Sequence, residues 1–113
     1  MTLPEYIHRY EARAERFSLL PTFQIHFESE QGFFCWAKFG PVFEVDHVCT
    51  NNARYFYDVA NEMAKVRGCV TLRTQTFHNP ASFMRLLKCT PNLTLSGVRP
   101  NGRMYWTMEK KVK

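Results

Sequence analysis

The chain has 113 residues, and 15 Lys and Arg against 10 Asp and Glu give it a formal net charge of +5 at pH 7. Hydrophobic residues make up 45% of the sequence and charged residues 22%, a balance that excludes intrinsic disorder and indicates a globular chain. The length predicts a single domain over residues 1–113, and the positive charge favours an acidic partner. No apolar run approaches the roughly 18 residues of a membrane span, and no leader peptide opens the chain, so we expect a cytoplasmic protein that does not enter a membrane.

The first expected element is a helix from about residue 3 to residue 17. Thr2 can cap it, a proline fits its first turn, and Glu5 completes a capping box. Its apolar side chains recur at three- and four-residue steps. Three arginines form a ridge beside this stripe, at Arg9, Arg13 and Arg16. We favour a solvated helix face for the ridge over a binding patch, because Glu11 and Glu15 offset its charge.

Extended segments follow the helix. Residues 22–28 alternate between apolar and polar side chains, as in a half-buried strand, and residues 33–39 resume after a polar turn, so the two predict an antiparallel hairpin. The second of these strands is apolar on both faces. After Gly40-Pro41, residues 42–48 are extended in character but less regular.

The middle of the chain predicts a helix, a strand and a second helix. Thr50-Asn51-Asn52 supplies cap residues for a helix whose apolar side chains keep helical spacing until Gly68. Residues 69–77 contain Val70 and three threonines, which favour a strand. Asn79-Pro80 then starts a short helix over residues 81–88.

The last two expected strands, residues 93–99 and 103–110, flank Asn101-Gly102, a dipeptide typical of two-residue hairpin loops. With that loop, Val98 faces Tyr105 and Gly97 faces Trp106, so the indole covers the glycine. The fold class is therefore α+β, with antiparallel hairpins packed against about three helices.

The C-terminal half, residues 52–109, resembles a winged-helix DNA-binding domain: a helix, a polar stretch, a short capped helix and a hairpin with an arginine at each side of its tip. The resemblance implies that the short helix enters the major groove while the hairpin contacts the backbone. Threonine-rich residues 71–76 depart from it, because the family has a helix there. The implied nucleic-acid-binding residues, with the basic C-terminus added, are Ser82, Arg85, Lys88, Arg99, Asn101, Arg103, Lys110 and Lys111.

Phe34, Trp36 and Lys38 share one face of the strand over residues 33–39 and give a second candidate surface. Exposed aromatics beside a basic group can stack unpaired bases or bury a protein partner. We favour the alternative that the first helix covers these rings, and cover by a second copy of the chain, as a homodimer, stays open.

Catalytic and metal-binding patterns find little support. His47, Asn61 and His78 superficially suggest a His-Asn-His nuclease, but the glycine-rich turn and a second carboxylate for a metal are missing. The cysteines give no zinc-site spacing, at Cys35, Cys49, Cys69 and Cys89. We therefore expect no enzyme, metal or cofactor, but a small nucleic-acid-binding protein that favours duplex DNA. The alternative is an interaction module or inhibitor that binds an acidic protein.

Overall fold

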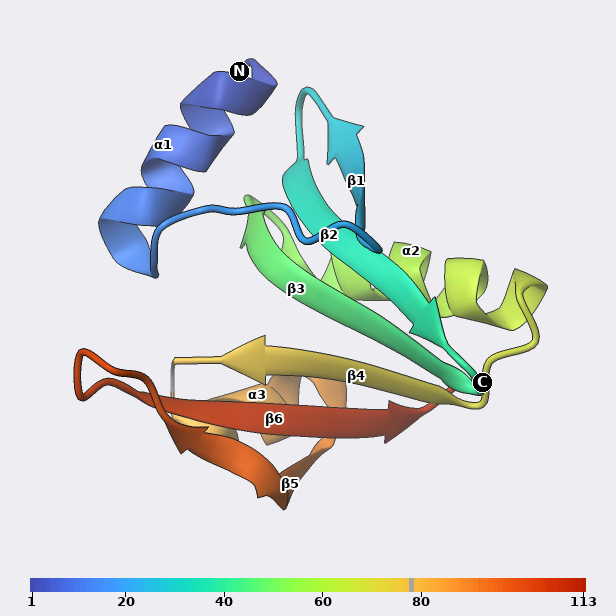
Figure 1. Cartoon of the computed structure of the whole chain (residues 1–113). Coiled ribbons are helices and arrows are strands. Elements are labelled where there is room, and N and C mark those ends of the chain that lie inside the picture. The colour runs from blue at the N-terminus through green and yellow to red at the C-terminus, as the bar shows by residue number, and fades with distance from the viewer. Residues whose placement is uncertain (78) are drawn as a thin grey trace.

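Six strands form one mixed sheet in the order β1-β2-β3-β4-β6-β5 within residues 1–77 and 79–113, which the computed structural model describes (Figure 1). The strands are β1 (Gln24–Glu28), β2 (Gly32–Phe39), β3 (Val42–Thr50), β4 (Thr71–Thr76), β5 (Thr90–Val98) and β6 (Met104–Lys111). The helices are α1 (Leu3–Arg13), α2 (Ala53–Val66) and α3 (Pro80–Leu87). The predicted α+β class is confirmed, and α1 ends four residues before the predicted boundary at residue 17.

Local sequence signals account for the helix starts. Thr2 and Glu5 form the predicted capping box at α1, in which the Thr2 side chain accepts from the Glu5 amide and the Glu5 carboxylate accepts from the Thr2 amide. Asn52 caps α2 by accepting from the Tyr55 amide, and Asn79 caps α3 by accepting from the Ala81 amide.

The sheet consists of two antiparallel halves joined by a parallel pair of strands. β1, β2 and β3 form one antiparallel half, and β4, β6 and β5 form the other. Between the halves, Val42–Val45 of β3 runs parallel to Thr71–Thr74 of β4, with α2 as the crossover connection. Figure 1 shows the two strands close together at this ladder and diverging beyond it.

The helices cover opposite faces of the sheet, which explains why β2 is apolar on both sides. Helix α1 packs on the face that carries Phe33 and Cys35, both fully buried. Helices α2 and α3 pack on the other face, where Phe34 lies edge-on to Phe56 of α2. The expectation that the first helix covers Phe34 is therefore wrong, because α2 does so.

The winged-helix expectation is also wrong. Residues 71–76 form β4, an interior strand of the sheet, so the helix that precedes a recognition helix in that family is absent at this position. The C-terminal hairpin is not a free wing, because β6 pairs with β4 along Thr71–Thr76 and continues the sheet.

The predicted register of that hairpin needs correction as well. The Arg99 amide donates to the Arg103 carbonyl, so three residues form the loop where two were expected. Gly97 consequently pairs with Tyr105, whose ring packs over the glycine in place of the expected indole. A bulge between Asn92 and Gly97 shifts the remaining pairs. No helix among the described residues is long and apolar enough to cross a bilayer.

Candidate functional site: the cleft between β3 and β4

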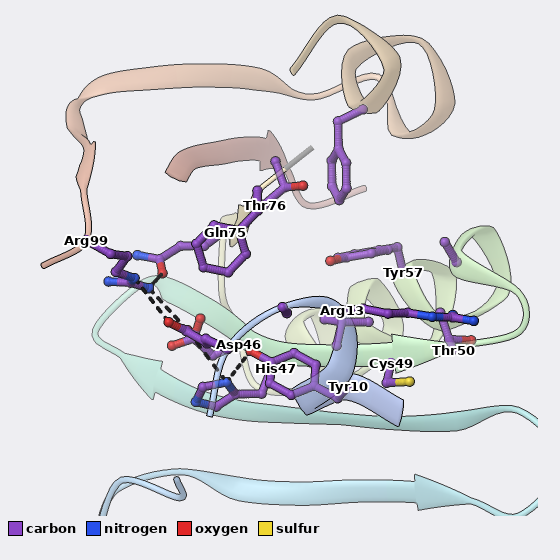
Figure 2. A pocket seen from close by; sticks show the side chains of 16 residues that line it. Tyr10, Arg13, Asp46, His47, Cys49, Thr50, Tyr57, Gln75, Thr76 and Arg99 are labelled. Carbon is purple, nitrogen blue, oxygen red and sulfur yellow. Dashed lines mark hydrogen bonds and ion pairs between the residues drawn. The ribbon is translucent and has the colours of Figure 1, made fainter. Parts of the chain in front are cut away.

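A cavity of about 240 Å³ opens where β3 and β4 separate (Figure 2). The parallel ladder ends at the pair Val45 and Thr74. Beyond this pair, side chains from both strands and from all three helices line the space, including Tyr10, Asp46, His47, Tyr57, Gln75 and Phe83. The cavity therefore connects the α1 face of the sheet with the α2 and α3 face.

A bulge in β3 shapes one wall of the cleft. Phe33 pairs with Cys49 and Cys35 pairs with Asp46, so Phe34 alone stands opposite His47 and Val48. His47 has a φ of 49°, in the left-handed region that few residues other than glycine adopt. In a regular strand adjacent side chains point to opposite faces. The bulge lets Asp46 and His47 both line the cavity.

The ring of His47 is held from α1. The Tyr10 hydroxyl lies 2.6 Å from Nδ1 of His47, and the Glu15 carboxylate lies 4.0 Å from the same nitrogen. Burial lowers the pKa of His47, against the opposing effect of Glu15, and burial raises the pKa of Tyr10. Burial therefore favours the neutral forms of both side chains, which share this hydrogen bond.

Arg99 reaches the cleft from the tip of the C-terminal hairpin. Its guanidinium donates to Gln75 Oε1 at 2.8 Å and pairs with Glu15 at 3.3 Å between Nε and Oε2. It also lies over the Tyr105 ring, 4.2 Å from the centroid. Figure 2 shows Arg99, Gln75, Asp46 and His47 at one end of the cavity.

Asp46 is the titratable group whose pKa suits acid–base chemistry. Burial raises the pKa of its carboxyl to about 6, even though the positive charge of Arg99 acts to lower it. A carboxylate with this pKa is ionised near neutral pH and can accept a proton.

Tyr57 lines the cleft, and its hydroxyl reaches Thr74, the β4 residue at which the ladder ends. The Tyr57 hydroxyl and Thr74 Oγ1 share a buried hydrogen bond of 2.9 Å. Burial raises the pKa of Tyr57, so its hydroxyl stays protonated at neutral pH. Cys49 also lines the cavity, but burial raises the pKa of its thiol, which argues against a thiolate nucleophile.

The turn from β3 into α2 lies at the end of the cleft away from Arg99 and Asp46 (Figure 2), where Thr50 and Ala53 line the cavity. Thr50 Oγ1 accepts from the Asn52 amide, and Asn52 Oδ1 accepts from the Tyr55 amide. The Asn51 side chain bonds to Arg9, to the Tyr6 hydroxyl and to the Glu30 carbonyl. The turn is thus capped by its own side chains and fastened to α1 and to the β1–β2 turn.

The structure separates the residues expected to bind nucleic acid. Ser82, Arg85 and Lys88 are exposed on and just after α3. Arg99 lies in the cleft, and Asn101 accepts from the Arg103 amide at the hairpin tip. The Arg103 side chain donates to the carbonyls of Ala14 and Arg13, at the end of α1. Lys110 and Lys111 pair with Leu72 and Thr71, at the opposite end of β6 from the hairpin tip.

The aromatic surface is largely covered. Phe34 is 1% exposed, while Trp36 stacks on Phe43 and lies under the Arg67 guanidinium, 4.4 Å from the ring centroid. Lys38 is exposed. Within the described residues, no group of three or more His, Cys, Asp or Glu is placed to hold a metal ion. His78, named in the nuclease alternative, lies outside those residues.

Sequence reasoning missed most of the cleft. Tyr10, Asp46, Tyr57 and Gln75 lie on four different elements, and nothing in the sequence links them. One signal was present: Glu44 and Asp46 alternate with apolar residues, His47 then interrupts this alternation, and such a break is typical of a bulge.

No protein-family model matches this sequence, and no curated protein matches it by sequence. Solved structures do match its fold. The ribosomal-protein-S18-alanine N-acetyltransferase from Escherichia coli aligns with a TM-score of 0.64 and 12% identity, over 98% of this chain and 88% of that chain. Nourseothricin acetyltransferase aligns with a TM-score of 0.59 and 18% identity, over 87% of this chain and 70% of that chain. Aminoglycoside 6'-acetyltransferase type Ii aligns with a TM-score of 0.56 and 15% identity, over 82% and 71%.

These likenesses contradict three expectations from the sequence. The fold is that of acetyltransferases and not of winged-helix proteins. The expectations of a DNA-binding protein and of a non-enzymatic interaction module are contradicted as well, because the similar structures are acetyltransferases. The chain has the acetyltransferase fold.

Proposed function

We propose that this protein is an acyltransferase, which moves an acetyl group from a thioester to a primary amine in the cleft between β3 and β4. The observation that carries the proposal is the position of Asp46, whose carboxyl has a raised pKa and lines this cleft in an acetyltransferase fold. The similar proteins act on amine-bearing molecules, an alanine of a ribosomal protein in one case and an aminoglycoside in another.

An acetyltransferase fold implies acetyl-coenzyme A as donor. The cleft fits the amide-bearing arm of this donor, whereas the adjoining turn does not fit its diphosphate. An extended arm that carries amides fits beside β3, because β3 has no ladder partner on the β4 side past Val45. The diphosphate does not fit the turn before α2. Close approach of phosphate to backbone amides favours glycine, and this turn is Asn51-Asn52 with side-chain caps.

The chain's own residues can carry out the transfer. The nitrogen of the neutral amine attacks the thioester carbonyl carbon, and Asp46 accepts the proton that this nitrogen loses as the C–N bond forms. A C–N bond forms, the C–S bond breaks and the thiolate leaves. The proton passes from Asp46 to the thiolate or to solvent, which returns Asp46 to its starting state.

Two further features favour this step. Peptide N–H groups of β3 that face the cleft past the ladder can polarise the thioester carbonyl and stabilise its developing negative charge. The rings of Tyr57 and Phe83 line the cleft and can limit the access of water to the reacting atoms.

The direct test is transfer of an acetyl group from a thioester to a panel of primary amines, with the mass of each acceptor amine measured by mass spectrometry. We expect acetylated amine with the wild-type chain and at least a 100-fold lower rate with Asp46→Asn. Glu44→Gln is the matched control, since Glu44 lies two residues away on β3 and burial also raises its pKa. Equal loss in both variants, or no transfer to any amine, would contradict the proposal.

A further inference from the structure

We infer that the acyl donor is recognised by its thioester arm and not by a nucleotide. This rests on the proposed function and specifies its donor: an acyl thioester on an amide-bearing arm, in which no diphosphate contributes to binding. The arm can come from a small molecule or from a carrier protein that bears it covalently.

The first support is the state of the turn between β3 and α2. A diphosphate bound at a helix start uses free backbone amides. Here the Asn52 amide donates to Thr50 Oγ1 at 2.9 Å and the Tyr55 amide donates to Asn52 Oδ1 at 3.2 Å. Side chains of the chain itself therefore occupy two of the backbone donors at this turn, those of Asn52 and Tyr55.

The second support is the rigidity of that turn. Asn51 Nδ2 donates to the Tyr6 hydroxyl and to the Glu30 carbonyl, and Asn51 Oδ1 accepts from Arg9 at 2.9 Å. The Asn51 amide donates to the Gln31 carbonyl at 2.8 Å. Rearranging the turn around a diphosphate would break hydrogen bonds to both α1 and the β1–β2 turn. Binding of a diphosphate at this turn would therefore cost the stabilisation that these bonds provide.

The third support is the absence of glycine beside the site. The glycines of this chain are Gly32, Gly40, Gly68, Gly97 and Gly102, and none lies between β3 and α2. Side chains on Asn51 and Asn52 keep a phosphate away from the backbone. Arg54, in the first turn of α2, is exposed and offers only a solvated charge.

The cavity is small for a complete nucleotide thioester. Its volume of about 240 Å³ lies below the roughly 300–1,000 Å³ of typical pockets for drug-sized ligands. The lining supplies strand backbone from β3 and aromatic rings from Tyr57 and Phe83. Such a site recognises an extended amide chain through backbone hydrogen bonds.

The inference is tested by comparing a ligand that has both arm and nucleotide with the arm alone and with the nucleotide alone. Binding of coenzyme A, pantetheine and adenosine 3',5'-diphosphate is measured by isothermal titration calorimetry with the full chain. We expect coenzyme A and pantetheine to bind with affinities within fivefold of each other, and the diphosphate alone to give no heat. An affinity for coenzyme A more than fivefold above that for pantetheine would overturn the inference.

Transfer rates and one variant complete the test. We expect S-acetylpantetheine, free or attached to an acidic carrier protein, to donate acetyl at least as fast as acetyl-coenzyme A. A faster carrier-bound reaction would identify the carrier as the source, in keeping with the formal charge of +5. Arg54→Ala should leave the coenzyme A affinity within twofold, and a larger loss would overturn the inference. Absence of transfer from every donor would overturn the proposed function, whereas the affinity ratio tests the donor separately.

Discussion

The Tyr10 hydroxyl lies 2.6 Å from Nδ1 of His47 and ties helix α1 to a β3 residue with left-handed backbone. The edge-on contact of the two rings, with centroids 5.3 Å apart, reinforces this link. Because His47 belongs to the bulge that brings Asp46 to the cavity, α1 helps to set the shape of the cleft.

Tyr10→Phe removes this hydrogen bond but keeps the ring. The imidazole nitrogen then loses its partner in a half-buried position, so we expect the free energy of unfolding to fall by about 1–3 kcal/mol. Urea unfolding followed by circular dichroism measures the change. Tyr55→Phe is the control, because the Tyr55 hydroxyl bonds to Glu28 at an exposed position and its loss should cost less than about 0.5 kcal/mol. Equal costs would show that the Tyr10 bond has no special role.

Asp46 should make stability fall as pH rises. Its pKa increases from 3.8 to about 6 on folding, so the folded state binds the proton more tightly than the unfolded state. The resulting penalty is absent below pH 4, grows between pH 4 and pH 6, and is complete above that range, with an upper limit of about 3 kcal/mol at roughly 1.4 kcal/mol per unit.

Asp46→Asn removes that penalty. We expect the variant to be more stable than the wild type at pH 8 and nearly equal to it at pH 4, as measured by thermal unfolding at both values. Transfer by the wild type should increase as pH rises through about 6, where Asp46 ionises. A variant that is less stable at pH 8 than the wild type would show instead that Arg99 stabilises the carboxylate.

Arg103→Ala should loosen the end of α1. Its guanidinium donates to the carbonyls of Ala14 at 2.7 Å and Arg13 at 3.2 Å and lies 4.5 Å from the Phe77 centroid. We expect faster amide exchange over residues 10–16 and a loss of about 1 kcal/mol, because the side chain is exposed. Arg85→Ala, at an exposed position of α3, should change neither. Unchanged exchange in Arg103→Ala would mean that these bonds do not hold the helix.

Gly32→Ala should be strongly destabilising. Gly32 has a φ of 128°, and an added Cβ would collide with the carbonyl oxygen of Cys49 on the neighbouring strand. We expect a loss of at least about 2 kcal/mol in thermal unfolding. Gly40→Ala separates collision from backbone strain, because Gly40 has a φ of 57° with open space around it and should cost only about 1 kcal/mol. Similar losses at both sites would exclude the collision as the cause.

Local signals explain why most elements were predictable from the sequence. The capping box at Thr2, the caps at Asn52 and Asn79, and the alternation over residues 22–28 each act within a few residues. These signals predicted all three helices and the extended segments that became strands. The threonines of residues 71–76 also predicted β4 correctly, although the winged-helix resemblance required a helix there.

The cleft could not be predicted in the same way, because it depends on tertiary arrangement. Its opening follows from where the β3–β4 ladder stops, and its charged end combines Asp46 with Arg99, 53 positions further along the chain. The hairpin register failed for a related reason. The bulge between Asn92 and Gly97 is stabilised by contacts of Asn92 and Ser96 that the turn dipeptide does not report.

The short parallel ladder between Val42–Val45 and Thr71–Thr74 also has a consequence for how the protein folds. The β1-β2-β3 meander and the β5–β6 hairpin need only local loop closure, whereas Thr71 of β4 pairs with Val42, 29 positions away, and with Lys111, 40 positions away. We therefore expect β4 to join its two neighbours late, with the meander and the hairpin as earlier folding units. Neither half holds the cavity alone, so the cavity comes into being only with the last step of folding.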